Sequence, residues 1–259
     1  MTENDEEPRV LDEDEVKSIS LLKAILPINV ILETQNTMMA TTFFQKSLLA
    51  IFVDHWSKSS AKKWIVVSSN YLSRLFSTQA ALTHASLDKQ IMYVMAKELT
   101  RIPPTTHSLP SVETGNMANI TFKYCQEMKS LEELLIGFCT TPSELLPDVL
   151  VVNGLNEYER GNKGPLSQFH YASILSLISE TAEYIGRRKQ TTILLYVSLS
   201  LIWTLTAEEQ ETWIKLFKQW THEVWILEGN SNRLVCDNIQ IQFTVLGSNI
   251  FLKTVSKVD

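Results

Sequence analysis

Short apolar runs alternate along the chain with stretches in which apolar side chains recur every three or four positions. The runs bounded by turn residues cover 27–33, 62–69, 119–125, 148–153 and 191–199. Runs of this length, rich in β-branched residues, are typical of strands that are buried on both faces. Because they alternate with helical patterns, they predict an α/β fold with a mostly parallel sheet that helices cover on both sides.

Apolar residues at helical spacing predict helices over 38–56, over 70–99 in two pieces, and over 169–187. In the second piece of 70–99, the apolar face would include Ile91 and Val94. The sequence therefore predicts that residues 91–95 are helical rather than extended.

Two pairs of residues have the spacing of a capping box, in which a Ser or Thr and a Glu three residues later accept hydrogen bonds from each other's backbone N–H groups. They are Ser130 with Glu133 and Thr206 with Glu209. Each predicts the first turn of a helix. The helix after Thr206 would carry a broad aromatic face, for which core packing and a protein interface are both open interpretations. That face comprises Trp213, Phe217 and Trp220.

The pattern changes after residue 222. Short strands are predicted over 223–229, 233–237, 239–246 and 249–255, with polar turns between them. In the third of these, Ile239, Ile241 and Phe243 alternate with polar residues, which predicts one face toward solvent. These strands are expected to be antiparallel and to lie at one edge of the sheet.

The charge is unevenly distributed. The 259 residues have a net charge of -6, and eight of the 29 acids lie within residues 1–15, where Arg9 is the only base. Such density of charge with few apolar groups predicts a disordered acidic tail over residues 1–20. The remainder, 21–259, is predicted to be a single domain that is close to neutral. A nucleic-acid partner is therefore allowed by the composition but not demanded by it.

Cysteine and histidine spacing predicts neither a metal site nor a cofactor site. Cys125, Cys139 and Cys236 are far apart, and none of the five histidines forms an HExxH pattern or a close pair. The opening lacks the basic and apolar regions of a signal peptide, and the longest apolar run is too short for a membrane span. We expect no bound metal or cofactor.

The first predicted strand-to-helix turn, "ETQNTMMATTFF" over 33–44, is where a phosphate-binding loop would lie in such a fold. A working loop needs glycines for close approach of the backbone, followed by Lys and then Ser or Thr. This turn contains no glycine and no lysine, and only Thr41 and Thr42 correspond to that pattern. Bulky Met38 and Met39 occupy the positions where the backbone would approach a phosphate.

The strand over 148–153 ends on Asn153, where a nucleotide-hydrolysing site would have an aspartate that holds magnesium. An amide is a poor magnesium ligand, and Glu157 or Glu159 would have to substitute for it. Together with the missing phosphate loop, Asn153 predicts that the architecture is kept and catalysis is lost. The expectation is that the protein is not an enzyme, with Thr41, Thr42, Asn153 and Glu157 forming a degenerate nucleotide site.

The stretches "NITFKYCQEMKSLEELLIGF" and "LPDVLVVNGLNEYE" resemble the RecA-type ATPase core, in particular the divergent eukaryotic recombinase paralogs and the Shu-complex-like accessory subunits. The resemblance covers roughly 25–255 and implies a RecA-like core. It also implies a non-catalytic subunit that pairs with another RecA-like paralog and assists the main recombinase on single-stranded DNA in the nucleus. The departures are the absent Gly-Lys-Thr loop and Asn153, and they put ATP hydrolysis in doubt.

The resemblance also suggests surfaces. In RecA-like folds the loops after the two central strands meet single-stranded DNA, and cations with aromatic residues suit that role. Here those loops contain Arg160 and Lys163, with Tyr158 beside them, and Trp203. Met38 and Met39 would then be free to contact a partner. The alternative with the same fold is an accessory subunit of the Elongator complex that modifies transfer RNA.

Overall fold

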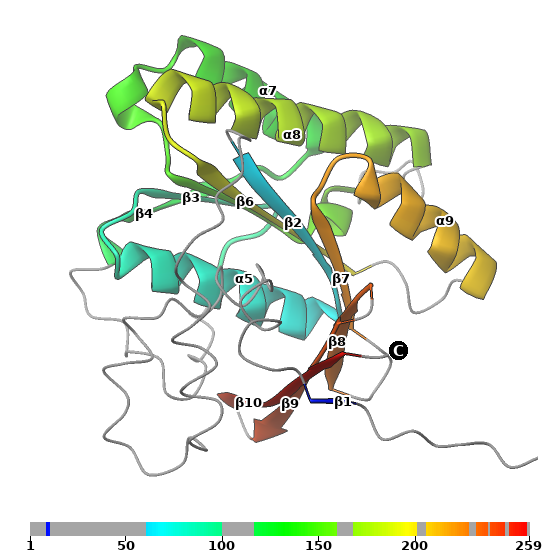
Figure 1. Ribbon diagram of the computed structural model, residues 1–259. Coiled ribbons are helices and arrows are strands. Elements are labelled where there is room, and N and C mark those ends of the chain that lie inside the picture. Colours follow the sequence, from blue (N-terminus) through cyan, green and yellow to red (C-terminus); the bar gives the residue numbers. More distant parts are fainter. Residues whose placement is uncertain are drawn as a thin grey trace, which may run out of the picture.

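The computed structural model describes residues 9–10, 61–99, 117–159, 168–200, 206–227, 232–237, 239–246 and 249–257 (Figure 1). Its strands are β1 (Arg9–Val10), β2 (Ala61–Val67), β3 (Ile91–Met95), β4 (Ile120–Tyr124), β5 (Val149–Asn153), β6 (Ile193–Leu199), β7 (Glu223–Leu227), β8 (Arg233–Cys236), β9 (Ile239–Leu246) and β10 (Asn249–Lys257). The helices are α5 (Asn70–Ala85), α7 (Met128–Gly137), α8 (Gln168–Lys189) and α9 (Ala207–Lys218). Short 3-10 turns are η2 (Phe138–Thr140), η3 (Ser143–Leu145) and η4 (Leu155–Glu159).

All the described strands belong to one sheet with the order β1-β10-β9-β8-β7-β2-β6-β5-β3-β4. Every pairing from β7 through β2, β6, β5 and β3 to β4 is parallel. The pairings from β7 through β8, β9 and β10 to β1 are antiparallel. The predicted α/β class is confirmed, with a mostly parallel sheet and C-terminal antiparallel strands. The arrangement is consistent with a RecA-like or another Rossmann-like fold.

Helices cover both faces of the parallel part (Figure 1). The connection from β2 to β3 through α5 runs in one direction along the sheet, whereas those through α7, α8 and α9 run in the other. Right-handed crossovers that run in opposite directions place their helices on opposite faces. Accordingly, α5 packs in one core, and α7, α8 and α9 pack in the other.

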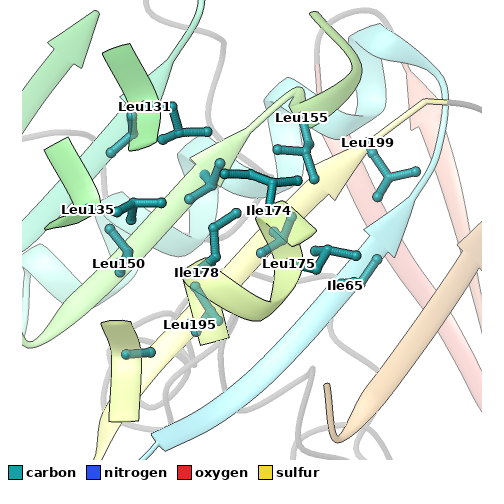
Figure 2. Close-up of a cluster of buried hydrophobic side chains, with 14 of the residues drawn as sticks. Ile65, Leu131, Leu135, Leu150, Leu155, Ile174, Leu175, Ile178, Leu195 and Leu199 are labelled. Atoms are coloured by element: carbon teal, nitrogen blue, oxygen red, sulfur yellow. The ribbon is translucent and has the colours of Figure 1, made fainter. Parts of the chain in front are cut away.

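The core under α8 includes many aliphatic side chains, and Figure 2 shows Ile174, Leu175 and Ile178 of this helix lying over the strands. They meet Leu150 of β5 and Leu195 of β6. Each fully buried side chain of this size stabilises the fold by roughly 1.5–3 kcal/mol. This layer packs α8 against β5 and β6, and the candidate site lies at the carboxyl ends of these two strands.

Several predicted elements are confirmed, including the strands at β2, β4, β5 and β6, the helix α8 and the four C-terminal strands. The Thr206–Glu209 capping box is present, with both reciprocal bonds formed. Trp213 and Phe217 are buried in the core under α9, so core packing is the correct interpretation of this aromatic face.

Two predictions at the level of elements are wrong. Residues 91–95 form strand β3 rather than a helix, because α5 ends at Ala85 and Asp88 turns the chain with a φ of 58°. Ser130 does not cap a helix, since α7 begins two residues earlier and Glu127 occupies the cap position without a side-chain bond. The earlier start lets Met128 join Leu131 and Leu135 on the buried face.

Other expectations lie partly or wholly outside the described residues. The strand over 27–33 and the helix over 38–56 are outside them. Within the stretch predicted as an acidic tail, Arg9 pairs with Lys257 and Val10 with Ser256 at the edge of the sheet. The remaining tail residues are also outside the described part.

Candidate functional site

The carboxyl end of β5 is closed by a buried hydrogen-bond chain. Asn153 is only 3% exposed, and its Oδ1 accepts a hydrogen bond from Ser198 Oγ of β6 at 2.8 Å. Ser198 Oγ in turn accepts from the backbone N–H of Gly154 at 3.0 Å. The amide oxygen of Asn153 therefore fastens β5 to β6 and does not face an open ligand position.

Gly154 turns the chain back immediately after the strand. Its φ is +67°, and Glu157 N donates to its carbonyl oxygen at 2.7 Å. A Cβ at this position would lie 3.2 Å from Glu157 Cγ. Both the backbone conformation and the close approach favour glycine at this position. The turn thereby sets the position of the Glu157 side chain.

Glu157 is held by an ion pair with Arg74, which lies on the second turn of α5. Arg74 Nη2 donates to Glu157 Oε1 at 2.8 Å and to Oε2 at 3.1 Å. The side chain of Glu157 is 10% exposed and that of Arg74 is 40% exposed. Both carboxylate oxygens are thus engaged, so Glu157 is not a free replacement for the missing aspartate.

A second polar bridge joins the same loop to the end of β6. Ser200 N donates to Asn156 Oδ1 at 2.8 Å, and Asn156 Nδ2 donates to Ser200 Oγ at 3.1 Å. The side-chain amide of Asn156 thus acts as both donor and acceptor toward one residue. The loop after β5 is therefore tied to β6 at Asn153 and Asn156, and to α5 at Glu157.

The turn at the carboxyl end of β2 is the described strand-to-helix turn that leads to Arg74. It consists of Ser68 and Ser69 alone, between Val67 of β2 and Asn70 of α5. Ser68 N donates to Leu199 O at 3.0 Å, and Ser69 Oγ caps α5 by accepting from Leu72 N at 3.4 Å. A turn this short, without glycine or lysine, cannot wrap a phosphate as a phosphate-binding loop does.

Buried tyrosines lie near the loop, but none is activated as a base. Burial raises the pKa of Tyr93 to about 12, and Ser77 and Thr78 hydrogen-bond its hydroxyl at 2.7 and 3.2 Å. Burial likewise raises the pKa of Tyr158. Tyr158 is only 4% exposed and packs in the core under α8, whereas Arg160 and Lys163, the cations expected beside it, lie outside the described residues.

The structure brings together two of the predicted site residues, Asn153 and Glu157, on either side of the Gly154 turn. The other predicted site residues lie outside the described part of the chain. They are Met38, Met39, Thr41, Thr42, Arg160, Lys163 and Trp203.

Sequence reasoning missed Arg74, Ser198 and Asn156. The signals available were the serines at the end of the apolar run over 191–199 and those that close the run over 62–69. Neither signal identified a partner, because each contact joins residues 44 or more positions apart.

In the described ranges, no helix is long and apolar enough to cross a membrane. The same ranges contain no group of three or more His, Cys, Asp and Glu side chains arranged as a metal site. Comparisons with models of protein families and with curated proteins found no match for this chain.

Proposed function

We propose that this chain is a non-catalytic RecA-like subunit that pairs with another RecA-like recombinase paralog. In this role it assists the main recombinase in assembling or remodelling filaments on single-stranded DNA, during homologous recombination repair in the nucleus. The observation that supports the proposal best is Asn153, a buried amide bonded to Ser198 at the end of the strand where a hydrolysing site needs a magnesium-binding carboxylate.

Phosphoryl transfer depends on a metal ion held by a carboxylate and on a cradle for the phosphates. At this edge the amide is used internally, the nearby carboxylate of Glu157 is paired with Arg74, and the turn after β2 has only two residues. A subunit of this kind keeps the scaffold, and any use of ATP falls to its partner or to the recombinase. Met38 and Met39 are the residues that we propose for contact with the partner, and Arg160, Lys163 and Trp203 those for contact with DNA.

Co-expression with candidate recombinase paralogs tests the partner. We expect the wild-type chain to elute as a heterodimer, and Met38→Asp with Met39→Asp to break the heterodimer while the monomer still melts cooperatively. A matched control replaces two exposed apolar residues elsewhere, Ile136→Asp with Leu145→Asp, and should leave the heterodimer intact. A wild-type chain that stays monomeric with every paralog but copurifies with subunits that modify transfer RNA would transfer the assignment to the Elongator alternative.

An ATPase measurement tests the non-catalytic assignment separately. The purified chain should show no ATP turnover above that of buffer, because neither Asn153 nor the paired Glu157 can hold magnesium as a hydrolysing site does. Turnover by the wild-type chain that disappears in Glu157→Ala would overturn this part of the proposal.

A further inference from the structure

The ion pair between Arg74 and Glu157 differs from the other half-buried ion pairs of the described residues. Lys63 pairs with Glu183 at 2.8 Å and also donates to Ser179 Oγ at 2.9 Å. Lys189 pairs with Asp148 and also donates to Leu146 O at 2.9 Å. The guanidinium of Arg74, in contrast, bonds within the described part of the chain to Glu157 alone.

The carboxylate at Arg74 is also held from its own side. Gly154 takes a left-handed conformation, and Glu157 N donates to its carbonyl oxygen, which sets the start of the Glu157 side chain. Both Oε1 and Oε2 then reach the same guanidinium nitrogen. A phosphate group also presents several oxygen acceptors that a guanidinium can bind. An anion on the same chain has a high effective concentration, so a free anion competes with it poorly.

We propose that Arg74 is the receptor of an anion site at the carboxyl edge of the sheet, and that the Glu157 carboxylate is its built-in occupant. Removal of this carboxylate opens the site to a phosphate group of a small molecule. The inference rests on the proposed function, in which this edge of the sheet takes no nucleotide. It deepens that function by naming the contact that keeps the edge closed to phosphate groups.

The experiment compares melting temperatures of the full chain in increasing inorganic pyrophosphate, with sodium chloride adjusted to hold ionic strength constant because salt screens such pairs. Glu157→Gln keeps the shape of the side chain and removes its charge. We expect its melting temperature to rise with pyrophosphate concentration, as ligand binding to the folded state requires. The wild-type chain should show no such rise.

Two control variants define the site. Glu183→Gln removes a carboxylate of similar exposure (18%, against 10% for Glu157), yet it should show no rise, since Lys63 is only 12% exposed and keeps Ser179 as a partner. Glu157→Gln combined with Arg74→Met removes the receptor and should lose the response of the single variant. The proposal is overturned if Glu157→Gln does not respond, if the wild-type chain responds equally, or if the double variant keeps the response.

If Glu157→Gln does not fold, reversing both charges provides the test. Arg74→Glu with Glu157→Arg should melt cooperatively near the wild-type temperature, whereas Arg74→Glu alone should melt lower. A double reversal as destabilised as the single one would overturn the proposal. None of these results depends on a partner subunit, so failure here is distinct from failure of co-expression to produce a heterodimer.

Discussion

Single polar residues decide the shape of the loop that follows β5. Asn153, Asn156 and Glu157 each bond to a different neighbour, and the three contacts tie the loop to β6 and α5. A buried polar group without a partner costs about 1–3 kcal/mol, so the loop is stable only because these groups meet their partners. Gly154 permits this arrangement through its positive φ.

Replacement of Gly154 by alanine should lower the free energy of unfolding by about 1–3 kcal/mol, because a residue with a Cβ is strained at this φ. The new Cβ would also lie 3.2 Å from Glu157 Cγ. Urea denaturation at neutral pH measures the change. Gly137→Ala is the matched control: Gly137 is helical and a Cβ there meets nothing within 4 Å. It should stabilise by about 0.5–1 kcal/mol, and equal signs for the two variants would contradict the prediction.

His222 should make stability depend on pH. Partial burial, followed by the charges of Lys63 and Lys62, lowers the pKa of His222, and its Nδ1 accepts a hydrogen bond from Lys63 N at 3.1 Å. The folded state therefore favours the neutral ring. The stability from this group is fully present above the ordinary pKa of about 6.5 and is lost as the pH falls through that value toward the folded pKa.

The measurement for this prediction compares urea midpoints at pH 7.5 and 5.5. His222→Asn places an amide oxygen near the position of Nδ1, so it keeps an acceptor for Lys63 N but does not titrate. The loss of stability between the two pH values should be smaller in this variant than in the wild-type chain. An equal loss in both would show that other groups cause the dependence.

The start of a helix depends on its packing as well as on its capping residues. Thr206 and Glu209 form both bonds of a capping box at the start of α9. Ser130 and Glu133 have the same spacing, yet α7 begins at Met128 and Ser130 lies within its first turn. The difference arises because Met128 packs into the core under α8, which extends the helix backward past the local signal.

Thr206→Ala should therefore lower the free energy of unfolding by about 1 kcal/mol, the typical effect of removing a capping side chain. Ser130→Ala should not lower it, because Ser130 caps nothing and alanine is a better helix former. Chemical denaturation of the two variants beside the wild-type chain decides between them. A loss at Ser130 as large as that at Thr206 would mean that α7 begins where its sequence suggests.

At the scale of the whole molecule, the C-terminal strands extend the sheet beyond β7 and complete the core that includes α5. Phe243 of β9 meets Phe76 of α5 edge to face, with ring centroids 5.6 Å apart. Leu234 and Ile241 are buried in the same core. The antiparallel strands are thus part of the structural core and not a separate appendage. At the far edge, β1 adds only two residues to β10.

Residues 1–18 should be dispensable for folding. Ordering a chain costs roughly 1–2 kcal/mol per residue, and this acidic segment has few apolar groups to offset that. Its described part is the short strand β1, which lies at the edge of the sheet and pairs Arg9 with Lys257 and Val10 with Ser256. A chain that begins at residue 19 should remain soluble and melt cooperatively. Loss of the cooperative transition would show that β1 is needed to complete the sheet.

The apolar pattern alone was sufficient to predict much of the fold. Long or strongly apolar segments such as those of β5, β6 and α8 were identified correctly, because burial on both faces leaves an unmistakable composition. The five residues of β3 were not, since a short apolar run fits a strand or a helix equally well. Only its place between β4 and β5 made it a strand.

For the site, the sequence by itself determined what is missing: a carboxylate at position 153 and a glycine- and lysine-containing turn, since both are matters of residue type. The tertiary structure decided what replaces them. The contacts of Asn153 with Ser198 and of Arg74 with Glu157 join residues 45 and 83 positions apart. Such pairs are set by which strand ends and helix turns become neighbours, and strand order follows from the packing of the whole sheet and not from any local pattern.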